Sequence, residues 1–413
     1  MKRRVLIIVP FDPIYPPMNG GMQRCFHIIH QLAIHFELTI IMNQKKDEFL
    51  LAAKQFPAIK NVEIYSTQDA AKTNDIFNVF PEKLQKALRY RWYKKKWNES
   101  ADGNFLKYYS VVKQLLKQQK FDVIILENIA TLNAISLIRK YDRRVKIIYN
   151  AHNVDTNLAA AFLEKKEIRK ERYISVRNSE SFLHKNVDAI LCCSKKDRDD
   201  FDLLNNGKLL ISIVPNGVNI SYKLSDEAVN SDHPGHILFC GFLETLPNQE
   251  GLLWFWKSVW PQIKIQFPSL KLLIVGSGKL PSSMNELLSD SSVIFTGPVN
   301  EVKEYYNKSS ISIVPLKTGS GTRLKILEAM SYGVPVVSTA KGAEGIDYTN
   351  GFNILIADSK EAFSNNIIRL LKNKEERISI QQHARQLAEI KYDWNIIGKG
   401  LAGFINTNFQ VNE

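Results

Sequence analysis

The sequence is poor in cysteine and has no long hydrophobic run. Its 413 residues contain four cysteines, and none of them forms the C-x-x-C pair that is typical of zinc and redox sites. We therefore expect buried thiols in a reducing compartment. No apolar stretch approaches the roughly 18 residues of a membrane-spanning helix, and the apolar run from Val5 to Val9 is too short for a signal peptide. These features predict a cytoplasmic chain that does not cross a bilayer.

Acidic residues are scarce relative to basic ones. The formal net charge is +13, which implies attraction to an anionic partner. Charge alone does not distinguish nucleic acid, lipid headgroups and phosphorylated substrates, so the positions of the cations have to decide between them.

Short apolar, β-branched runs alternate with longer amphipathic segments along the whole chain. This pattern predicts strands and helices that alternate around parallel sheets. Strands are expected at residues 4–9, 38–42, 123–126, 145–149, 189–193 and 210–214, and then at 236–240, 271–275, 293–295, 311–314, 334–338 and 354–357. The series restarts once. The predicted fold class is therefore α/β, with two Rossmann-like doubly wound domains that face a central cleft.

A polar segment without periodicity separates the two series of strands. Residues 218–235 mark this linker, so the first domain covers residues 1–217 and the second covers residues 236–394. Two domains also suit the length, because single cores stop growing beyond about 250–300 residues. The last segment, 395–413, has a helical pattern with no strand after it, and it could cross back to the first domain.

The strongest chemical signal is the run ISIVPLKTGSGTRLKILEAMSYGVPVVST, residues 311–339. It reads as a strand, a glycine-rich turn, a helix and a second strand. Gly319 and Gly321 permit tight turns, and Thr322 is a good helix N-cap. Arg323 and Lys325 then place two cations in the predicted first turn, where the helix dipole disfavours positive charge. A bound anion would compensate, whereas the alternative is a solvated basic helix start.

Glu328 stands three residues beyond Lys325 on the same predicted helix face. A cation aimed at a diphosphate, with a carboxylate one turn deeper, suits a nucleotide sugar, since a carboxylate accepts both ribose hydroxyls. The alternative for Glu328 is an intrahelical pair with Lys325.

These residues resemble the donor-site signature of glycosyltransferase family 4, which comprises retaining enzymes with the GT-B fold. The resemblance rests on GSGTRLKILEAM, followed by GVPVVST and GAEGI, and it extends over nearly the whole chain. It also includes PPMNGGMQR in the first glycine turn, AHNVD after a strand, PNGVN between the domains, and CGFLETLPNQEG at the opening of the second domain.

The resemblance assigns donor-binding roles in the second domain. Glu328 corresponds to the glutamate that binds the ribose, and Arg323 and Lys325 lie at the diphosphate, next to the loop with Gly321 and Thr322. Pro298 and Val299 match the loop whose backbone meets the base.

In the first domain the resemblance implies two further sets of site residues. Gly20 and Gly21 match the glycine loop that faces the phosphates and the acceptor, and Gly21 is assigned to the catalytic set. His152 matches the histidine near the sugar hydroxyls and the anomeric centre. Read without the family, the two glycines could instead permit a chain reversal, and His152 could be an ordinary loop or core histidine.

The sequence departs from the family pattern at three positions. The first of two glutamates separated by seven residues is replaced by Ser320, and the usual Arg and Lys after the second-domain glycine are replaced by Phe242 and Asn248. We infer that neutralisation of the diphosphate has moved onto Arg323 and Lys325.

Two weaker signals point to metal or dinucleotide binding. Asp197 and the acids after it resemble a metal-binding D-x-D motif, but they follow Ser194 at an apparent helix start, where acids suit the dipole. Gly276 and Gly278 form a lone G-x-G, because Pro281 occupies the last position of G-x-G-x-x-G. We therefore expect no metal and no cofactor, only a nucleotide-diphosphate sugar as co-substrate.

Residues 82–97 (EKLQKALRYRWYKKKW) have the pattern of a basic amphipathic helix. Such a helix suits an anionic membrane face, and the alternative is a helix packed on its own domain with a solvated basic side. Lipid-linked acceptors in the family favour peripheral contact at the inner face of the cell membrane.

The sequence therefore predicts a retaining, metal-independent hexosyltransferase. It would move a hexose-type sugar from a nucleotide-diphosphate donor to a glycan or lipid-linked acceptor in surface polysaccharide or glycoconjugate synthesis. The alternatives are a nucleotide-sugar epimerase on the same scaffold and a non-catalytic basic protein that binds nucleic acid or sugar. The cations collect at a phosphate loop and in one amphipathic segment, without an RNP-like aromatic pattern, so nucleic acid is not the expected partner.

Overall fold

A computed structural model describes residues 2–17, 19–69, 105–220, 235–319, 321 and 323–409. The chain divides into two compact units. Unit 1 comprises Met1–Pro215 with Ile397–Glu413, and unit 2 comprises Asn216–Ile396. Unit 2 begins at Asn216 and therefore includes the segment 218–235 that the sequence predicts as a linker.

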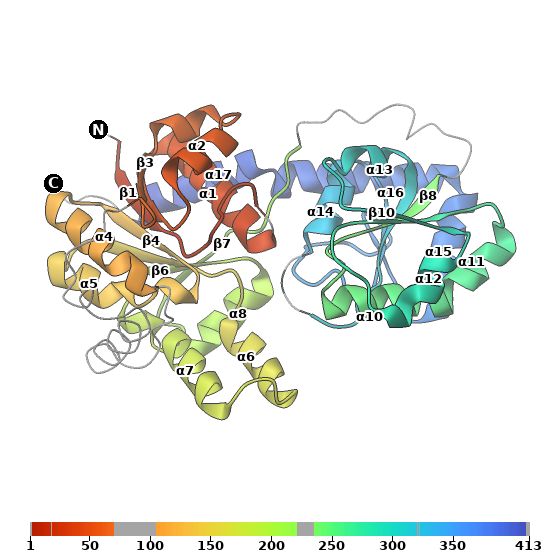
Figure 1. Ribbon diagram of the computed structural model, residues 1–413, viewed down its shortest axis with the longest axis horizontal. Helices are drawn as coiled ribbons and strands as arrows, with labels where there is room; N and C mark the ends of the chain where they lie inside the picture. The colour runs from red at the N-terminus through yellow and green to blue at the C-terminus, as the bar shows by residue number, and fades with distance from the viewer. Residues whose placement is uncertain are drawn as a thin grey trace. The chain divides into compact units, whose positions relative to one another are not determined.

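In the described part of unit 1, seven strands form a parallel sheet in the order β3-β2-β1-β4-β5-β6-β7. The strands are β1 Arg4–Ile8, β2 Glu37–Met42, β3 Glu63–Ser66, β4 Val123–Glu127, β5 Lys146–Asn150, β6 Ala189–Cys192 and β7 Leu210–Ile213. Helices lie on both faces of the sheet (Figure 1). Central strands such as β4 are therefore buried throughout, which explains their continuous apolar sequences.

The helices of unit 1 alternate with its strands. They are α1 Gly20–His35, α2 Lys46–Ala52, η1 Pro57–Asn61, α4 Phe105–Gln118, η3 Ile129–Thr131, α5 Ala134–Tyr141, α6 Asp155–Glu164, α7 Lys170–Ser181, η4 Leu183–Lys185 and α8 Lys195–Leu204. A core of mainly leucine and isoleucine side chains from β1, β4, β5 and β6 packs against α4, α5 and α8.

In the described part of unit 2, six strands form a second parallel sheet in the order β10-β9-β8-β11-β12-β13. The strands are β8 His236–Cys240, β9 Leu272–Val275, β10 Val293–Gly297, β11 Ser309–Val314, β12 Val336–Ser338 and β13 Leu355–Ile356. The helices are α10 Leu246–Trp254, the π-helix η5 Phe255–Val259, α11 Trp260–Gln266, η6 Ser282–Met284, α12 Asn285–Ser289, α13 Lys303–Asn307, α14 Leu324–Ser331, α15 Lys360–Lys372, α16 Lys374–Leu387 and the π-helix η7 Ala388–Tyr392. The last helix, α17 Trp394–Asn408, begins in unit 2 and belongs to unit 1 from Ile397 onward.

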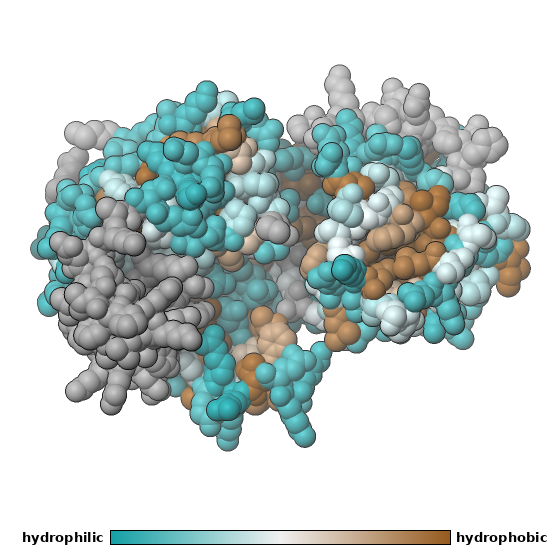
Figure 2. Space-filling view, viewed as in Figure 1, coloured by the Kyte–Doolittle hydropathy of each residue, from teal (hydrophilic) through white to brown (hydrophobic). Residues whose placement is uncertain are grey.

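The sheet of unit 2 separates two apolar cores. Ile237 and Phe239 of β8 face one core, whereas Leu238 and Cys240 face the other, as the two-residue period of a strand requires. Figure 2 shows hydrophobic side chains over β10, the edge strand, where Ile294 and Phe295 are exposed.

The last helix leaves unit 2 and joins unit 1. Trp394 still donates its backbone N–H to Val218 of unit 2. Farther along α17, the Arg3 guanidinium donates to the carbonyls of Ile405 and Phe409, at 2.9 and 2.6 Å. Gly398 lies so close to Gln31 of α1 that a Cβ there would stand 2.4 Å from the Gln31 Oε1 atom. Figure 1 shows this blue helix beside the red α1.

The α/β prediction with two doubly wound domains is confirmed. Each predicted strand is present, with ends within two residues of the expected ones. The sequence analysis missed only β3 among the described strands. This edge strand is four residues long and reads EIYS, so its alternation is too short to identify.

Candidate functional site

Each sheet has one point at which its strand order reverses. In unit 2 this point lies between β8 and β11, and in unit 1 it lies between β1 and β4. Loops that leave neighbouring strands in opposite directions at such a point open a crevice, and ligands of open α/β sheets bind there, at the carboxyl ends of the strands. The predicted site residues follow the carboxyl ends of β1 and β11 at these points, and of β5 and β10 in the same sheets.

In unit 2 the loop after β11 leads into helix α14. Gly319 and Gly321 have φ angles of +97° and +81°, a region that favours glycine. Helix α14 begins at Leu324, with Arg323 in the N-cap position and without a side-chain cap. The prediction that Arg323 lies in the first helical turn is therefore wrong, since its backbone is extended, although Lys325 does lie in that turn. Ser320 and Thr322 lie outside the described residues.

Helix α10 holds this loop from one side. The Thr318 hydroxyl donates to the Glu250 carboxylate at 2.7 Å, and the Lys317 ammonium lies 4.1 Å from the centroid of the Trp254 ring. These contacts hold the loop residues that precede Arg323 and α14.

Lys325 is a half-buried cation whose partner is a neutral group. Its Nζ donates to Asn248 Oδ1 at 2.9 Å and lies 4.5 Å from the centroid of the Phe239 ring. A Cβ on Gly241 would stand 2.6 Å from the same Nζ, so the glycine leaves room for the ammonium. Burial lowers the pKa of Lys325 from 10.5 to about 8, and the nearby Arg323 charge adds to this effect.

Arg323 is also half-buried. One of its terminal nitrogens donates to the Thr318 carbonyl at 3.4 Å. Burial lowers the pKa of Arg323, and the charge of Glu344 works against this shift. Neither Arg323 nor Lys325 therefore extends into open solvent, and two positive charges are held together beside the start of α14.

Glu328 lies one turn farther along α14. Its Oε2 accepts a hydrogen bond from the Tyr306 hydroxyl at 3.4 Å. Burial raises the pKa of Glu328, whereas the Tyr306 hydrogen bond and the Lys325 charge lower it. Within the described part of the chain, Glu328 and Lys325 form no ion pair within 4 Å, so the structure does not favour the intrahelical pair as the reason for Glu328.

Asn248 has a structural role that the sequence analysis missed. It donates through Nδ2 to the Phe242 carbonyl at 2.6 Å, which turns its Oδ1 toward Lys325. The two departures from the family pattern therefore act together: the backbone of Phe242 orients Asn248, and Asn248 orients Lys325. Such a contact spans 77 residues of sequence, and the sequence gives no sign of it.

Pro298 and Val299 lie in the loop after β10. Pro298 is exposed, and Val299 packs partly against the apolar core beneath α14. This loop begins at the carboxyl end of its strand, two strands from β8.

In unit 1, Gly20 and Gly21 are the first two residues of α1, and Asn19 caps the helix by accepting the Met22 N–H at 3.0 Å. Neither glycine has a positive φ, so a chain reversal does not explain them. Gly21 instead faces a site residue, because a Cβ there would stand 3.2 Å from His152 Nδ1.

His152 follows β5 and is tied to Glu127, the last residue of β4. His152 Nε2 lies 2.8 Å from Glu127 Oε2, and the two side chains are 6% and 0% exposed. The other oxygen of Glu127 accepts from Asn150 Nδ2 at 2.8 Å, and Asn150 Oδ1 accepts from Arg24 at 2.8 Å. His152 is thus part of a buried polar chain and is not an ordinary loop residue.

Glu127 is not among the site residues predicted from the sequence. A signal was available, because the apolar run VIIL ends in a carboxylate at the carboxyl end of a predicted strand. An acid in that position is either solvated at the strand end or held in a site, and only its neighbours decide between the two.

The weaker sequence signals have structural explanations. Ser194 caps α8 and bonds to Asp197, so this acid belongs to a helix start, and no cluster of potential metal ligands occurs among the described residues. Gly276 meets the backbone of Gly241, since a Cβ there would stand 1.8 Å from the Gly241 oxygen. The four cysteines are buried and free.

Two further observations concern the predicted membrane contact. The basic segment 82–97 lies outside the described residues. Among the helices that the structure describes, none combines the length and the apolar character needed to span a bilayer.

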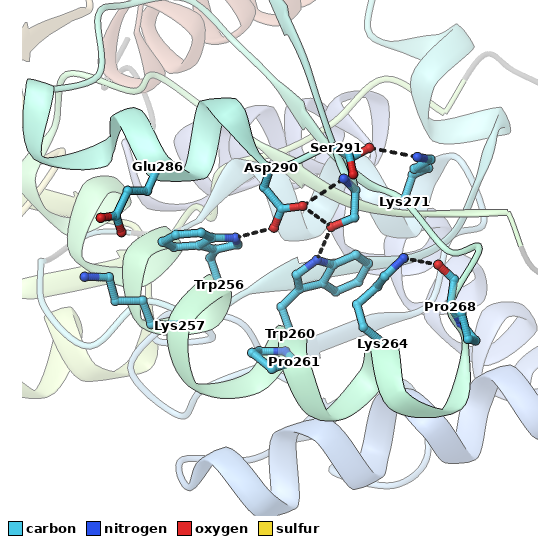
Figure 3. A pocket seen from close by; sticks show the side chains of 11 residues that line it. Trp256, Lys257, Trp260, Pro261, Lys264, Pro268, Lys271, Glu286, Asp290 and Ser291 are labelled. Carbon is cyan, nitrogen blue, oxygen red and sulfur yellow. Dashed lines mark hydrogen bonds between the residues drawn. The ribbon is translucent and has the colours of Figure 1, made fainter.

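A cavity of about 710 Å³ opens elsewhere in unit 2, lined by Trp256, Trp260 and several lysines (Figure 3). Its polar groups already bind one another: the two indole N–H groups donate to Asp290 and Ser292, and Lys271 donates to the Ser291 carbonyl. It lies at the amino ends of β9 and β10, opposite the end at which ligands of such sheets bind. We therefore do not place the active site there.

Two family models match the chain. Residues 77–222 match the one described as Glycosyltransferase Family 4, and residues 234–373 match the one described as Glycosyl transferases group 1.

Curated relatives include an uncharacterized 44.6 kDa protein in the cps region of Klebsiella pneumoniae, which is 25% identical over 94% of this chain and 96% of its own length. A GDP-mannose-dependent monoacylated alpha-(1-6)-phosphatidylinositol monomannoside mannosyltransferase of Corynebacterium glutamicum is 28% identical over 36% of this chain and 42% of its own length.

Solved structures with the same fold include Anabaena HepE in complex with UDP and glucose, at a TM-score of 0.66 and 14% identity, covering 98% of this chain and 100% of that one. Sucrose-phosphate synthase from Thermosynechococcus elongatus has a TM-score of 0.69 at 14% identity and covers 99% of both chains.

Proposed function

Because the chain is a glycosyltransferase of family 4 with the GT-B fold, we propose that it is a retaining hexosyltransferase that uses a nucleotide-diphosphate sugar. The acceptor in this proposal is a glycan or a lipid-linked saccharide of surface polysaccharide or glycoconjugate synthesis. The genetic setting named for the Klebsiella relative and the lipid substrate named for the Corynebacterium relative support this choice.

The observation that carries the proposal is the state of Lys325. A half-buried ammonium is costly unless a negative group compensates it. In the described part of the chain its hydrogen-bond partner is the neutral Asn248. Burial lowers the pKa of Lys325 to about 8; the Arg323 cation acts in the same direction, and the Glu328 carboxylate raises the pKa without offsetting burial. A diphosphate at this strand end would supply further negative charge, in a position where open α/β sheets bind ligands.

The donor would occupy the residues around α14. Arg323 and Lys325 would bind the diphosphate, and the loop with Gly321 and Thr322 would approach it with backbone N–H groups. Glu328 would accept the ribose hydroxyls, and the backbone of Pro298 and Val299 would meet the base.

The reacting sugar would meet residues of unit 1. Gly20 and Gly21 would face the phosphates and the acceptor, and His152 would orient the sugar. Leaving of the diphosphate would be stabilised by Arg323 and Lys325, which are already positioned where negative charge develops. Since these side chains can carry out that neutralisation, we propose that transfer requires no metal ion, and that activity persists in the presence of EDTA.

The test begins with thermal shifts in UDP, GDP, UDP-glucose, UDP-galactose and GDP-mannose, because a ligand that binds the native state raises its apparent stability. We expect at least one nucleotide to raise the melting temperature. Glu328→Ala should weaken the binding of that nucleotide by roughly ten-fold or more, since the substitution removes the carboxylate and leaves the two ribose hydroxyls without their acceptor. Glu301→Ala, at an exposed position of the same unit, is the matched control.

Two results would overturn the proposal. One is the absence of a thermal shift with every nucleotide, together with salt-sensitive retention on DNA. The other is conversion of a nucleotide sugar into its epimer when no acceptor is present, which would identify the epimerase instead.

A cytoplasmic location at the inner face of the membrane completes the proposal. It rests on the basic pattern of residues 82–97 and on the lipid substrate of the Corynebacterium relative. Membrane binding is measured by sedimentation of the protein with vesicles that contain anionic lipid and, for comparison, with neutral vesicles. Equal binding to both kinds of vesicle would contradict it.

A further inference from the structure

Glu127 is a completely buried carboxylate at the point where the sheet of unit 1 reverses. An isolated buried carboxylate is expensive, so its two oxygens need donors. Both have one: Asn150 Nδ2 donates to one oxygen, and His152 Nε2 lies at hydrogen-bonding distance from the other, each at 2.8 Å.

The direction of this hydrogen-bond chain is fixed by Arg24. A guanidinium only donates, and Arg24 donates to the Val214 carbonyl at 2.7 Å and to Asn150 Oδ1 at 2.8 Å. The amide of Asn150 must therefore turn its Nδ2 toward Glu127. Glu127, as a carboxylate, then accepts from His152, which places the proton of the neutral imidazole on Nε2.

This arrangement leaves the other ring nitrogen as an acceptor. His152 Nδ1 is buried and has no hydrogen-bond partner among the described residues. It faces Gly21. A Cβ added at Gly21 would stand 3.2 Å from His152 Nδ1, 3.3 Å from Asn19 Oδ1 and 3.4 Å from the Phe11 ring. A buried lone pair without a donor costs about 1–3 kcal/mol, so this position suits a hydroxyl that arrives with a ligand.

We propose that Glu127 is the positioning residue of His152: it holds the imidazole with the proton on Nε2, so that Nδ1 accepts a hydrogen bond from a hydroxyl of the bound sugar substrate. The inference rests on the proposed glycosyltransferase function. It adds to that function a residue, a tautomer and the direction of one substrate hydrogen bond. Asn150 and Arg24 extend the positioning chain to the backbone of Val214.

Glu127→Gln reverses the chain without changing its shape. The Asn150 Nδ2 group still requires an oxygen, so the glutamine amide nitrogen must face His152 Nε2. His152 Nε2 then has to accept a hydrogen bond from the glutamine amide. The ring proton therefore moves to Nδ1, and Nδ1 can no longer accept a hydrogen bond from a sugar hydroxyl. Glu164→Gln, at an exposed position of the same unit, is the matched control.

The first measurement is the tautomer of His152 by long-range proton–nitrogen NMR of the full chain, with the signal assigned from His152→Gln. We expect Nε2–H in the wild type and in Glu164→Gln, and Nδ1–H in Glu127→Gln. An Nδ1–H tautomer in the wild type overturns the proposal, whether or not Glu127→Gln folds.

The second measurement separates this inference from the proposed function. For whichever of UDP-glucose, UDP-galactose and GDP-mannose stabilises the wild type, Glu127→Gln should lower kcat by at least about ten-fold, as expected for a wrongly oriented imidazole. The thermal shift in UDP or GDP should remain unchanged, because the residues proposed to hold the nucleotide do not include Glu127 or His152.

An unchanged kcat in Glu127→Gln overturns the positioning role and leaves the glycosyltransferase proposal intact. If no nucleotide binds to the wild type, the proposed function fails, while the NMR result still decides the tautomer.

Discussion

Replacing Lys325 with Met should stabilise the protein without ligand and remove its response to nucleotide. Burial lowers the pKa of Lys325 from 10.5 to about 8, and one pKa unit corresponds to about 1.4 kcal/mol. Holding the ammonium charged at pH 7 therefore costs the native state about 3 kcal/mol. Met keeps the length and removes the charge, but it leaves Asn248 Oδ1 without its donor, which costs about 1 kcal/mol.

The expected net gain is about 2 kcal/mol, to be measured by urea unfolding at pH 7 and by the melting temperature. Its pH dependence is specific. The unfolded lysine keeps its proton up to its ordinary pKa of 10.5, whereas the native one loses it near 8. The cost to the wild type therefore disappears as the pH rises from about 8 to about 10.5, and the advantage of Lys325→Met should disappear with it.

In the presence of UDP or GDP the wild type should become more stable than Lys325→Met, because the diphosphate stabilises only the protein that carries the cation. Lys303→Met, at a half-buried position of the same unit that follows the β10 loop, is the matched control and should change neither quantity appreciably. If Lys325→Met lowers the stability of the ligand-free protein and keeps the full nucleotide response, the reasoning about this site is refuted.

Three further predictions follow from other contacts. Asn248→Asp places a carboxylate beside Lys325, which should raise the pKa of that lysine. The carboxylate also repels the diphosphate, so nucleotide binding should weaken by roughly ten-fold. Isothermal titration calorimetry measures the affinity, and tighter binding would contradict the prediction. Gly21→Ala brings a methyl group 3.2 Å from His152 Nδ1, so turnover should fall. The free energy of unfolding should change by less than about 1 kcal/mol, because alanine also favours the helix. Unchanged turnover would show that the substrate does not use the space beside Nδ1. Burial and the charge of Asp155 raise the pKa of Glu180 to about 7, and burial raises the pKa of Asp155 to about 6. Stability linked to these acids is fully present below their ordinary pKa values of 3.8 and 4.5 and is lost as the pH rises from there to about 6 to 7. Asp155→Asn should therefore raise the melting temperature at pH 8 more than at pH 5.

Hydrophobic periodicity identified most of the architecture. The strands of both sheets are buried on two faces and therefore read as continuous apolar runs, such as RVLII in β1 and HILFC in β8. The edge strand β3 was not predicted, because it is only four residues long and only alternate residues in it are well buried.

The candidate site was only partly visible in the sequence. Arg323, Lys325 and Glu328 stood out because a helix start with two cations is unfavourable without an anion. The structure corrected one detail, since α14 begins one residue after Arg323. Asn248 stood out only as a departure from the family pattern, without a role. Tyr306 and Glu127 did not stand out, because each resembles an ordinary polar residue until its partner is known.

By itself, the sequence determined the two α/β domains and the placement of a glycine loop, two cations and a histidine after particular strands. These properties depend on local periodicity and on turn residues, which neighbours along the chain specify. Only the tertiary structure decided that Lys325 meets a neutral amide 77 residues away and that Glu127 orients His152 across 25 residues. Parallel strands bring such residues together at one edge of the sheet, and the order in which they meet depends on strand topology, which no local pattern encodes.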